Sequence, residues 1–251
     1  MKHIVLILLS ASVLLAHDHI EIGQDEVEPG RLAFSDLFFQ LALYVPPGVP
    51  LSNDSPNFPG GYFANELTFT TETNTLPPAT GANPRIEFLS VTGPVGATFA
   101  FWEAGASAPT ISIPTGWTTS AGDLRSFAVV VGGDNHLHGR VFTATKPGVY
   151  QITFRAVDAA GLYQPTADRT LTFEVLTPPQ LRISLHGADV RLTFPSRPGL
   201  SYEIQSTTNL AGGTWEPATA IEPLDGTGGN LEATEPLGNR QRVFYRLVEY
   251  R

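Results

Sequence analysis

The chain has 251 residues, of which 42% are hydrophobic and 16% charged, so it is long enough to bury a core in two domains. Its formal net charge of −9 comes without a basic cluster, which excludes the electrostatic surface that nucleic acids and anionic membranes require. Cysteine is absent, so disulfides and thiolate ligands are excluded, and a metal would have to be held by histidine, carboxylate or carbonyl groups.

The N-terminal residues have the pattern of a secretory signal peptide. Lys2 precedes an apolar run from Ile4 to Leu15, which is too short to remain as a membrane span. We expect cleavage after Ala16, so that residues 1–16 are removed and the mature chain begins at His17 without a membrane span. The expected location is outside the cytoplasm, either secreted or at the cell surface, with the periplasm as an alternative.

The first mature segment alternates in the manner of a strand. His17, His19 and Glu21 fall on one face, whereas Asp18, Ile20 and Ile22 fall on the other. The run from Leu32 to Val45 fits either a short amphipathic helix or a buried strand, because its periodicity does not separate the two. Residues 46–61 are rich in Pro, Gly, Asn and Ser, which predicts a long surface loop.

Short β-branched and aromatic runs follow, separated by Gly and Pro turns. The predicted strands are Glu66–Thr71, Arg85–Val91, Thr98–Glu103, Thr110–Ile113, Ser126–Val131, Arg140–Thr143, Val149–Val157 and Thr170–Val175. This spacing is typical of a β-sandwich, so we predict an all-β protein in which residues 17–176 form an Ig-like β-sandwich domain.

Pro178 and Pro179 interrupt the strand pattern and mark a domain boundary. Residues 177–251 are expected to form a small β-sandwich-like module. Its predicted strands are Leu181–Leu185, Val190–Phe194, Ser201–Ser206, Thr214–Pro217, Leu231–Thr234 and Arg242–Glu249.

The histidines provide the main chemical signal. Five of the six lie in the predicted mature chain, and four of these form the pairs His17/His19 and His136/His138. Side chains two apart on a strand point the same way, so each pair can direct two imidazoles at one ion. Zn²⁺, with Cu²⁺ as the alternative, prefers such ligands, and Asp18, Glu21, Asp134 and Asn135 are candidates to orient them.

Alternatives to a metal site follow from other residues. With His17 as the amino-terminal residue, its amine, the following backbone nitrogens and His19 would hold Cu²⁺ or Ni²⁺ in a square plane. Alternatively, the amine and ring of His17 with one other histidine would chelate copper as in lytic polysaccharide monooxygenases, but no other feature indicates that activity and we expect no enzyme. A glycan platform would use exposed aromatic rings, for which the candidates are Tyr62, Trp102, Trp117 and Tyr163. Arg140 is expected to share a strand face with the second histidine pair, where it would repel a cation unless it points past the site or pairs with Glu21.

Two resemblances add to these expectations. His136-Leu137-His138, followed by Lys146-Pro147-Gly148-Val149-Tyr150, resembles choice-of-anchor M domains of bacterial surface proteins, and His17-Asp18-His19 resembles the start of secreted members controlled by a zinc-uptake repressor. Residues 177–251, with Pro198-Gly199-Leu200-Ser201-Tyr202 and Trp215, resemble a terminal β-module of secreted planctomycete and verrucomicrobial proteins.

The resemblances imply a secreted or surface protein that binds zinc, with cell-surface or extracellular matrix components as possible partners. The alternative is a structural or adhesive surface protein, or a glycan-binding module, whose histidines have no metal role.

Overall fold

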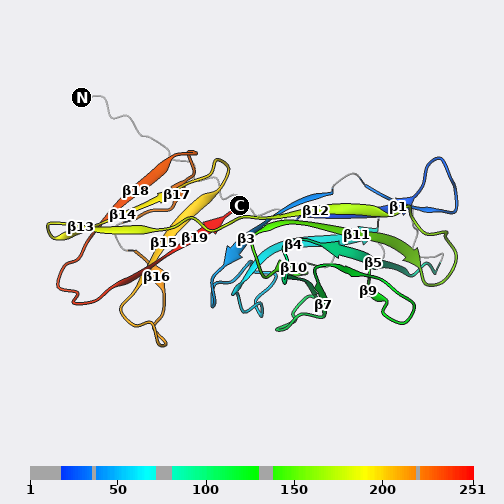
Figure 1. Ribbon diagram of the computed structural model, residues 1–251, viewed down its shortest axis with the longest axis horizontal. Helices are drawn as coiled ribbons and strands as arrows, with labels where there is room; N and C mark the ends of the chain where they lie inside the picture. Colours follow the sequence, from blue (N-terminus) through cyan, green and yellow to red (C-terminus); the bar gives the residue numbers. More distant parts are fainter. Residues whose placement is uncertain (1–17, 36–37, 72–80, 130–137, 219–220) are drawn as a thin grey trace, which may run out of the picture.

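The computed structural model describes residues 18–35, 38–71, 81–129, 138–218 and 221–251. Within these ranges the chain is all-β, as predicted, and its strands form two groups along the long axis (Figure 1). The described residues contain no helix long and apolar enough to cross a membrane. The helical alternative for Leu32 to Val45 is wrong, since the described residues of this run form two strands.

The described residues before 176 form twelve strands: β1 (Asp18–Gln24), β2 (Leu32–Phe34), β3 (Phe39–Val45), β4 (Tyr62–Thr71), β5 (Pro84–Thr92), β6 (Thr98–Trp102), β7 (Ile111–Pro114), β8 (Trp117–Thr118), β9 (Arg125–Ala128), β10 (Val141–Ala144), β11 (Gly148–Asp158) and β12 (Arg169–Val175). The described residues after 176 form seven more: β13 (Arg182–His186), β14 (Asp189–Pro195), β15 (Ser201–Thr207), β16 (Glu216–Pro217), β17 (Leu224–Asp225), β18 (Asn230–Pro236) and β19 (Phe244–Tyr250). The predicted strands agree with these to within a few residues, whereas the two-residue strands β8 and β17 were not predicted.

The first twelve strands form a single sheet that folds over itself. One half has the order β7-β6-β10-β4-β3 and the other half the order β3-β12-β11-β5-β8. β3 joins them, because Leu43–Val45 pair antiparallel with β4 while Phe39–Ala42 pair parallel with β12. β1 pairs in parallel with residues 67–71 of β4 and antiparallel with β2. The two halves face each other, which gives a sandwich in coarse outline.

An aromatic core fills the space between the two halves. Phe99 on β6 lies 5.3 Å from Phe173 on β12, and Phe69 on β4 lies 5.4 Å from Phe154 on β11, each measured between ring centroids with nearly perpendicular planes. All four side chains are buried. Each comes from the inward-facing set of its strand, so strand alternation determines which residues form the core.

The loop of residues 46–61 covers the outer face of the β6-β10-β4 half. Trp102 of β6 is buried on this face between Phe58 of the loop and Tyr62 of β4, with ring centroids 5.1 and 5.3 Å away. Its indole N–H donates to the Thr143 hydroxyl at 2.9 Å. A strand face that would otherwise meet solvent therefore forms a second apolar cluster, which we call the outer cluster.

Strands β13 to β19 pair with one another in two small sheets, β13-β14-β18 and β16-β15-β17 with β19 beside β15. Their apolar core includes Leu43 of β3, while Val248 of β19 packs into the outer cluster. Arg246 of β19 donates to the carbonyl of Pro47. The last strand thus returns to the side of β3, as the position of the C-terminus in Figure 1 shows.

Candidate functional site

The structure describes two of the four predicted metal ligands. His17 and His136 lie outside the described residues. His19 is half-buried on β1, where Ile20 and Ile22 are fully buried, so the predicted alternation of this strand is confirmed for residues 19–22. His138 is half-buried and precedes β10 by three residues.

Strand β4 is the common neighbour of both histidine segments. His19 lies opposite Thr68 of β4 in the parallel ladder with β1. Val141, the first residue of β10, lies opposite Glu66 of β4 in an antiparallel ladder. Adjacent strands are about 4.8 Å apart, so two segments that pair with neighbouring positions of one strand lie in the same region of the sheet.

Asp54 is the carboxylate that faces His138. Its Oδ2 lies 3.2 Å from Nδ1 of the imidazole. Ser52 positions this loop residue, because its hydroxyl accepts the Asp54 backbone N–H at 3.0 Å and donates to Oε1 of Glu66 at 2.6 Å. The chain of contacts from β4 through Ser52 and Asp54 to His138 ties the loop to the histidine.

Gly139 allows this close approach. Its φ of +77° is a left-handed conformation that glycine adopts readily, and a Cβ at this position would collide with the Asp54 carbonyl oxygen. The turn also interrupts the strand alternation between His138 and Arg140. His138 contacts the loop that covers the outer face of the sheet, whereas Arg140 turns to the aromatic core.

Of the alternatives for Arg140, the shared face with His138 and the pair with Glu21 are wrong, whereas the side chain does point away from the histidine. Its side chain is 3% exposed and its guanidinium lies over the rings of Phe101 and Phe127, at 5.6 and 5.4 Å from their centroids. Nε donates to Oε1 of Glu103 at 2.6 Å and Nη2 donates to Oε2 at 3.1 Å. Glu103, and not Glu21, neutralises this cation.

Of the four predicted orienting groups, the structure describes the side chain of Glu21 alone. Asp134 and Asn135 lie outside the described residues, as does the side chain of Asp18. The backbone N–H of Glu21 donates to the Ser35 hydroxyl, which fixes this part of β1. No local pattern indicated Asp54, because it lies in an irregular loop far from His138 in the sequence.

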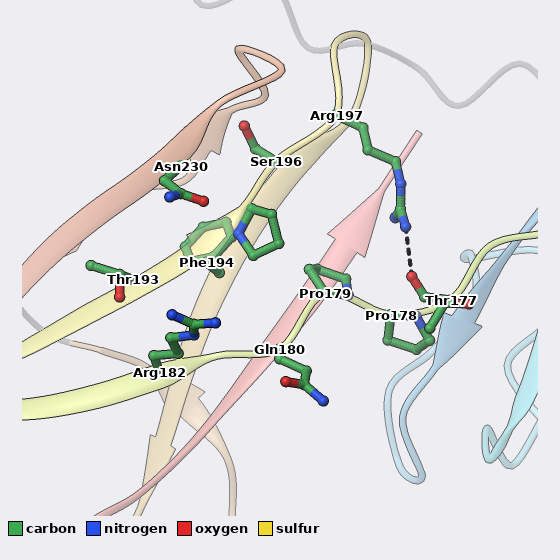
Figure 2. A pocket seen from close by; sticks show the side chains of 11 residues that line it. Thr177, Pro178, Pro179, Gln180, Arg182, Thr193, Phe194, Ser196, Arg197 and Asn230 are labelled. Atoms are coloured by element: carbon green, nitrogen blue, oxygen red, sulfur yellow. Dashed lines mark hydrogen bonds between the residues drawn. The ribbon is translucent and has the colours of Figure 1, made fainter.

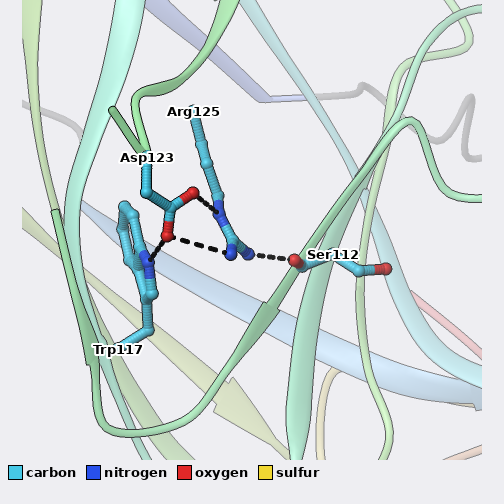
Figure 3. A network of polar contacts seen from close by, with 4 residues as sticks. All are labelled: Ser112, Trp117, Asp123 and Arg125. Carbon is cyan, nitrogen blue, oxygen red and sulfur yellow. Dashed lines mark hydrogen bonds and ion pairs between the residues drawn. The ribbon is translucent and has the colours of Figure 1, made fainter. Parts of the chain in front are cut away.

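The predicted glycan platform is contradicted, because its four aromatic residues do not form one exposed surface. Trp102 and Tyr62 pack in the outer cluster, while Trp117 and Tyr163 pack against the main core. The Trp117 indole N–H donates to Asp123 at 2.6 Å, and Arg125 lies 4.8 Å above the ring (Figure 3). Hydrogen bonds from Arg125 and then Trp117 lower the pKa of the Asp123 carboxyl.

His186 is exposed on β13, as expected for a surface residue. Among the described residues, no three His, Asp or Glu side chains are grouped closely enough to hold a metal ion.

Comparison with protein-family models and with curated protein sequences finds no match to this chain. The resemblance to choice-of-anchor M domains therefore rests on the motifs at His17 to His19 and His136 to Tyr150.

Proposed function

We propose that this chain is a secreted or cell-surface protein that binds a transition metal, with zinc as the expected ion and copper as the alternative. The proposed ligands are His17, His19, His136 and His138. The observation that carries the proposal is the register of β4, which pairs with the strand of His19 and with the strand that follows His138. In the proposal, residues 17–176 form the Ig-like sandwich that holds this site.

The contact between His138 and Asp54 fits a metal ligand. Histidines that bind zinc commonly donate one ring N–H to a carboxylate, which fixes the ring and leaves the other nitrogen for the metal. Nδ1 of His138 lies 3.2 Å from Asp54 Oδ2 as an ion-pair contact, so in the proposal Nε2 is the nitrogen that would bind the ion. Zinc takes four ligands in structural sites, a number that the two pairs would supply.

Arg140 does not oppose a cation at this position. Its guanidinium is paired with the Glu103 carboxylate and lies over Phe101 and Phe127, so its charge is compensated within the sandwich. The nearby carboxylates Asp54 and Glu66 favour a positive ion.

Calorimetric titration of the purified mature protein with zinc tests the proposal. We expect one ion per chain, loss of uptake in the double variant His136→Ala/His138→Ala, and unchanged uptake in the control His186→Ala, which removes an exposed histidine from β13. If both pairs hold one ion, His19→Ala alone should weaken uptake as strongly as His138→Ala.

A dissociation constant for zinc above about 0.1 mM, which corresponds to a binding free energy near −5.5 kcal/mol, would reject metal binding as the function. The Asp54 contact would then serve only to fasten the loop of residues 46–61, and the structural or adhesive alternative would take precedence. Mass spectrometry of the secreted protein checks that the mature chain begins at His17.

A further inference from the structure

A notch lies where the linker after β12 meets the end of β14. It has a volume of about 460 Å³, within the range of small-molecule sites. Figure 2 shows Arg182 and Arg197 reaching toward it from opposite sides, with Phe194 and Pro179 between them. Among the described residues, neither the outer cluster nor His19 or His138 contributes to its lining.

The two prolines of the linker explain why this space is open. β13 pairs with β14 only as far as Arg182 opposite Thr193, while Phe194 and Pro195 continue the ladder on the other edge with β18. Pro178 and Pro179 have no backbone N–H and cannot extend β13 along that edge. On the side that faces β13, the edge of β14 beyond Thr193 therefore has no strand beside it among the described residues. This unpaired edge forms the notch.

The charge of the notch is opposite to that of the protein. The chain carries 24 acidic residues and a net charge of −9, yet the lining residues of the notch include two arginines and no Asp or Glu. Residues 177–251 contain seven arginines and eight acidic residues, a net charge of −1, so most of the negative charge lies elsewhere. Arg197 is paired with Glu249, so an anion approaching this notch meets the positive charge of Arg182 and no carboxylate among the lining residues.

The two arginines differ in whether their guanidinium groups are already engaged by the protein. Arg197 is held in place, because Nη1 pairs with Glu249 Oε1 at 2.9 Å and Nη2 donates to the Thr177 carbonyl at 2.6 Å. Arg182 is exposed, and within the described part of the chain no hydrogen bond or ion pair engages its guanidinium. Its planar fork is therefore available for the bidentate binding of a carboxylate or sulfate.

The remaining walls suit a ligand with many hydroxyl groups. Hydroxyl and amide side chains also line the notch, from Thr193, Asn230 and Gln180. These groups both donate and accept hydrogen bonds, as a sugar requires. Pro178 and Pro179 supply half-buried apolar surface against which a ring can rest.

We propose that this notch binds an acidic saccharide, with Arg182 as the residue that recognises its carboxylate or sulfate group. The site gives the C-terminal strands a role in attachment to an anionic glycan, and it does not depend on the metal site.

Titration calorimetry of the full mature chain at physiological salt, with EDTA present to remove metal, tests the proposal. The probes are a tetragalacturonate for carboxylate, a chondroitin sulfate tetrasaccharide for sulfate, and neutral cellotetraose. We expect at least one acidic probe to bind with a Kd below about 1 mM and cellotetraose to bind at least tenfold more weakly.

The variant Arg182→Ala should weaken binding of the acidic probe about tenfold without unfolding the protein, because this side chain is exposed on β13. Arg242→Ala is the matched control, since it removes the same charge from an exposed residue that does not line the notch. The His136→Ala/His138→Ala variant should bind the probe normally.

Failure of both acidic probes to bind below about 5 mM would overturn the proposal. So would equal binding of cellotetraose, or an equal loss in the Arg182 and Arg242 variants, which would indicate attraction by net charge only. A negative result in the zinc titration leaves this outcome unaffected.

Discussion

Removing the negative partner of Arg140 should destabilise the protein more than removing Arg140 itself. The guanidinium is 97% buried at the end of the aromatic core, given its side-chain exposure of 3%, whereas the Glu103 side chain is 39% exposed. Nη1 of Arg140 is buried and has no hydrogen-bond partner among the residues that the structure describes. The substitution Glu103→Gln keeps the shape and one acceptor, but it leaves this buried cation uncompensated.

The expected loss of stability in each variant follows from this difference in burial between Arg140 and Glu103. Breaking a buried ion pair by removing one partner costs about 3–5 kcal/mol, and partial exposure of Glu103 reduces the expected cost to about 2–3 kcal/mol. Arg140→Met retains an apolar stem over Phe101 and Phe127 and leaves an exposable carboxylate, so its cost should be below about 1 kcal/mol. The double variant should recover most of the loss caused by Glu103→Gln.

Thermal unfolding, followed by the fluorescence of Trp102 and Trp117, measures these differences in the N-terminal sandwich. For a chain of this size, 1 kcal/mol corresponds to about 2–4 °C in Tm, so Glu103→Gln should lower Tm by roughly 4–12 °C and Arg140→Met by less than about 4 °C. Zinc uptake of Arg140→Met should equal that of the unaltered protein. A larger loss for Arg140→Met than for Glu103→Gln would refute the reasoning.

Three further substitutions probe other contacts. Asp54→Asn should weaken zinc binding about 10–100-fold in calorimetry because it removes the carboxylate behind His138, and the exposed neighbour Asn53→Ala should have no effect. Trp102→Ala should lower the free energy of unfolding by about 3–5 kcal/mol in urea titrations and increase protease cleavage within residues 46–61; unchanged cleavage would argue against its role in holding that loop. At Asp158, burial acts to raise the pKa, but four backbone N–H donors outweigh it and the pKa lies below its ordinary value. The stabilisation by this carboxylate is therefore present above about pH 4 and is lost as pH falls through the lower folded-state pKa, so Asp158→Asn should flatten the acid limb of a plot of stability against pH.

The strands of this protein could be read from its sequence because strand formation and burial follow local alternation. Residues 149–157 were predicted as one strand, and β11 spans Gly148–Asp158 with alternate side chains buried. The same rule placed Ile20 and Ile22 inward and His19 outward. The run from Leu32 to Val45 was ambiguous because its chain crosses from one half of the sheet to the other, which mixes two burial patterns.

The candidate site was predictable only in part, since a residue type and its spacing specify a ligand but not what surrounds it. The two histidine pairs were recognised from the sequence, and the pairing of β4 with β1 and with β10 came from the fold. The partner of His138 is a loop residue, and the positive φ at Gly139 reverses the face expected for Arg140. The two-residue alternation of a strand does not predict a turn such as the one at Gly139.

The sequence by itself determined the all-β class, most strand positions and the residue types able to bind a metal or an anion, because these depend on neighbours within a few residues. Only the tertiary structure decided that Asp54 faces His138, that Glu103 neutralises Arg140, that the loop of residues 46–61 buries Trp102, and that Arg182 and Arg197 share a notch. Each of these contacts joins segments distant in the sequence. They arise from the order in which the strands pair, and no local pattern encodes that order.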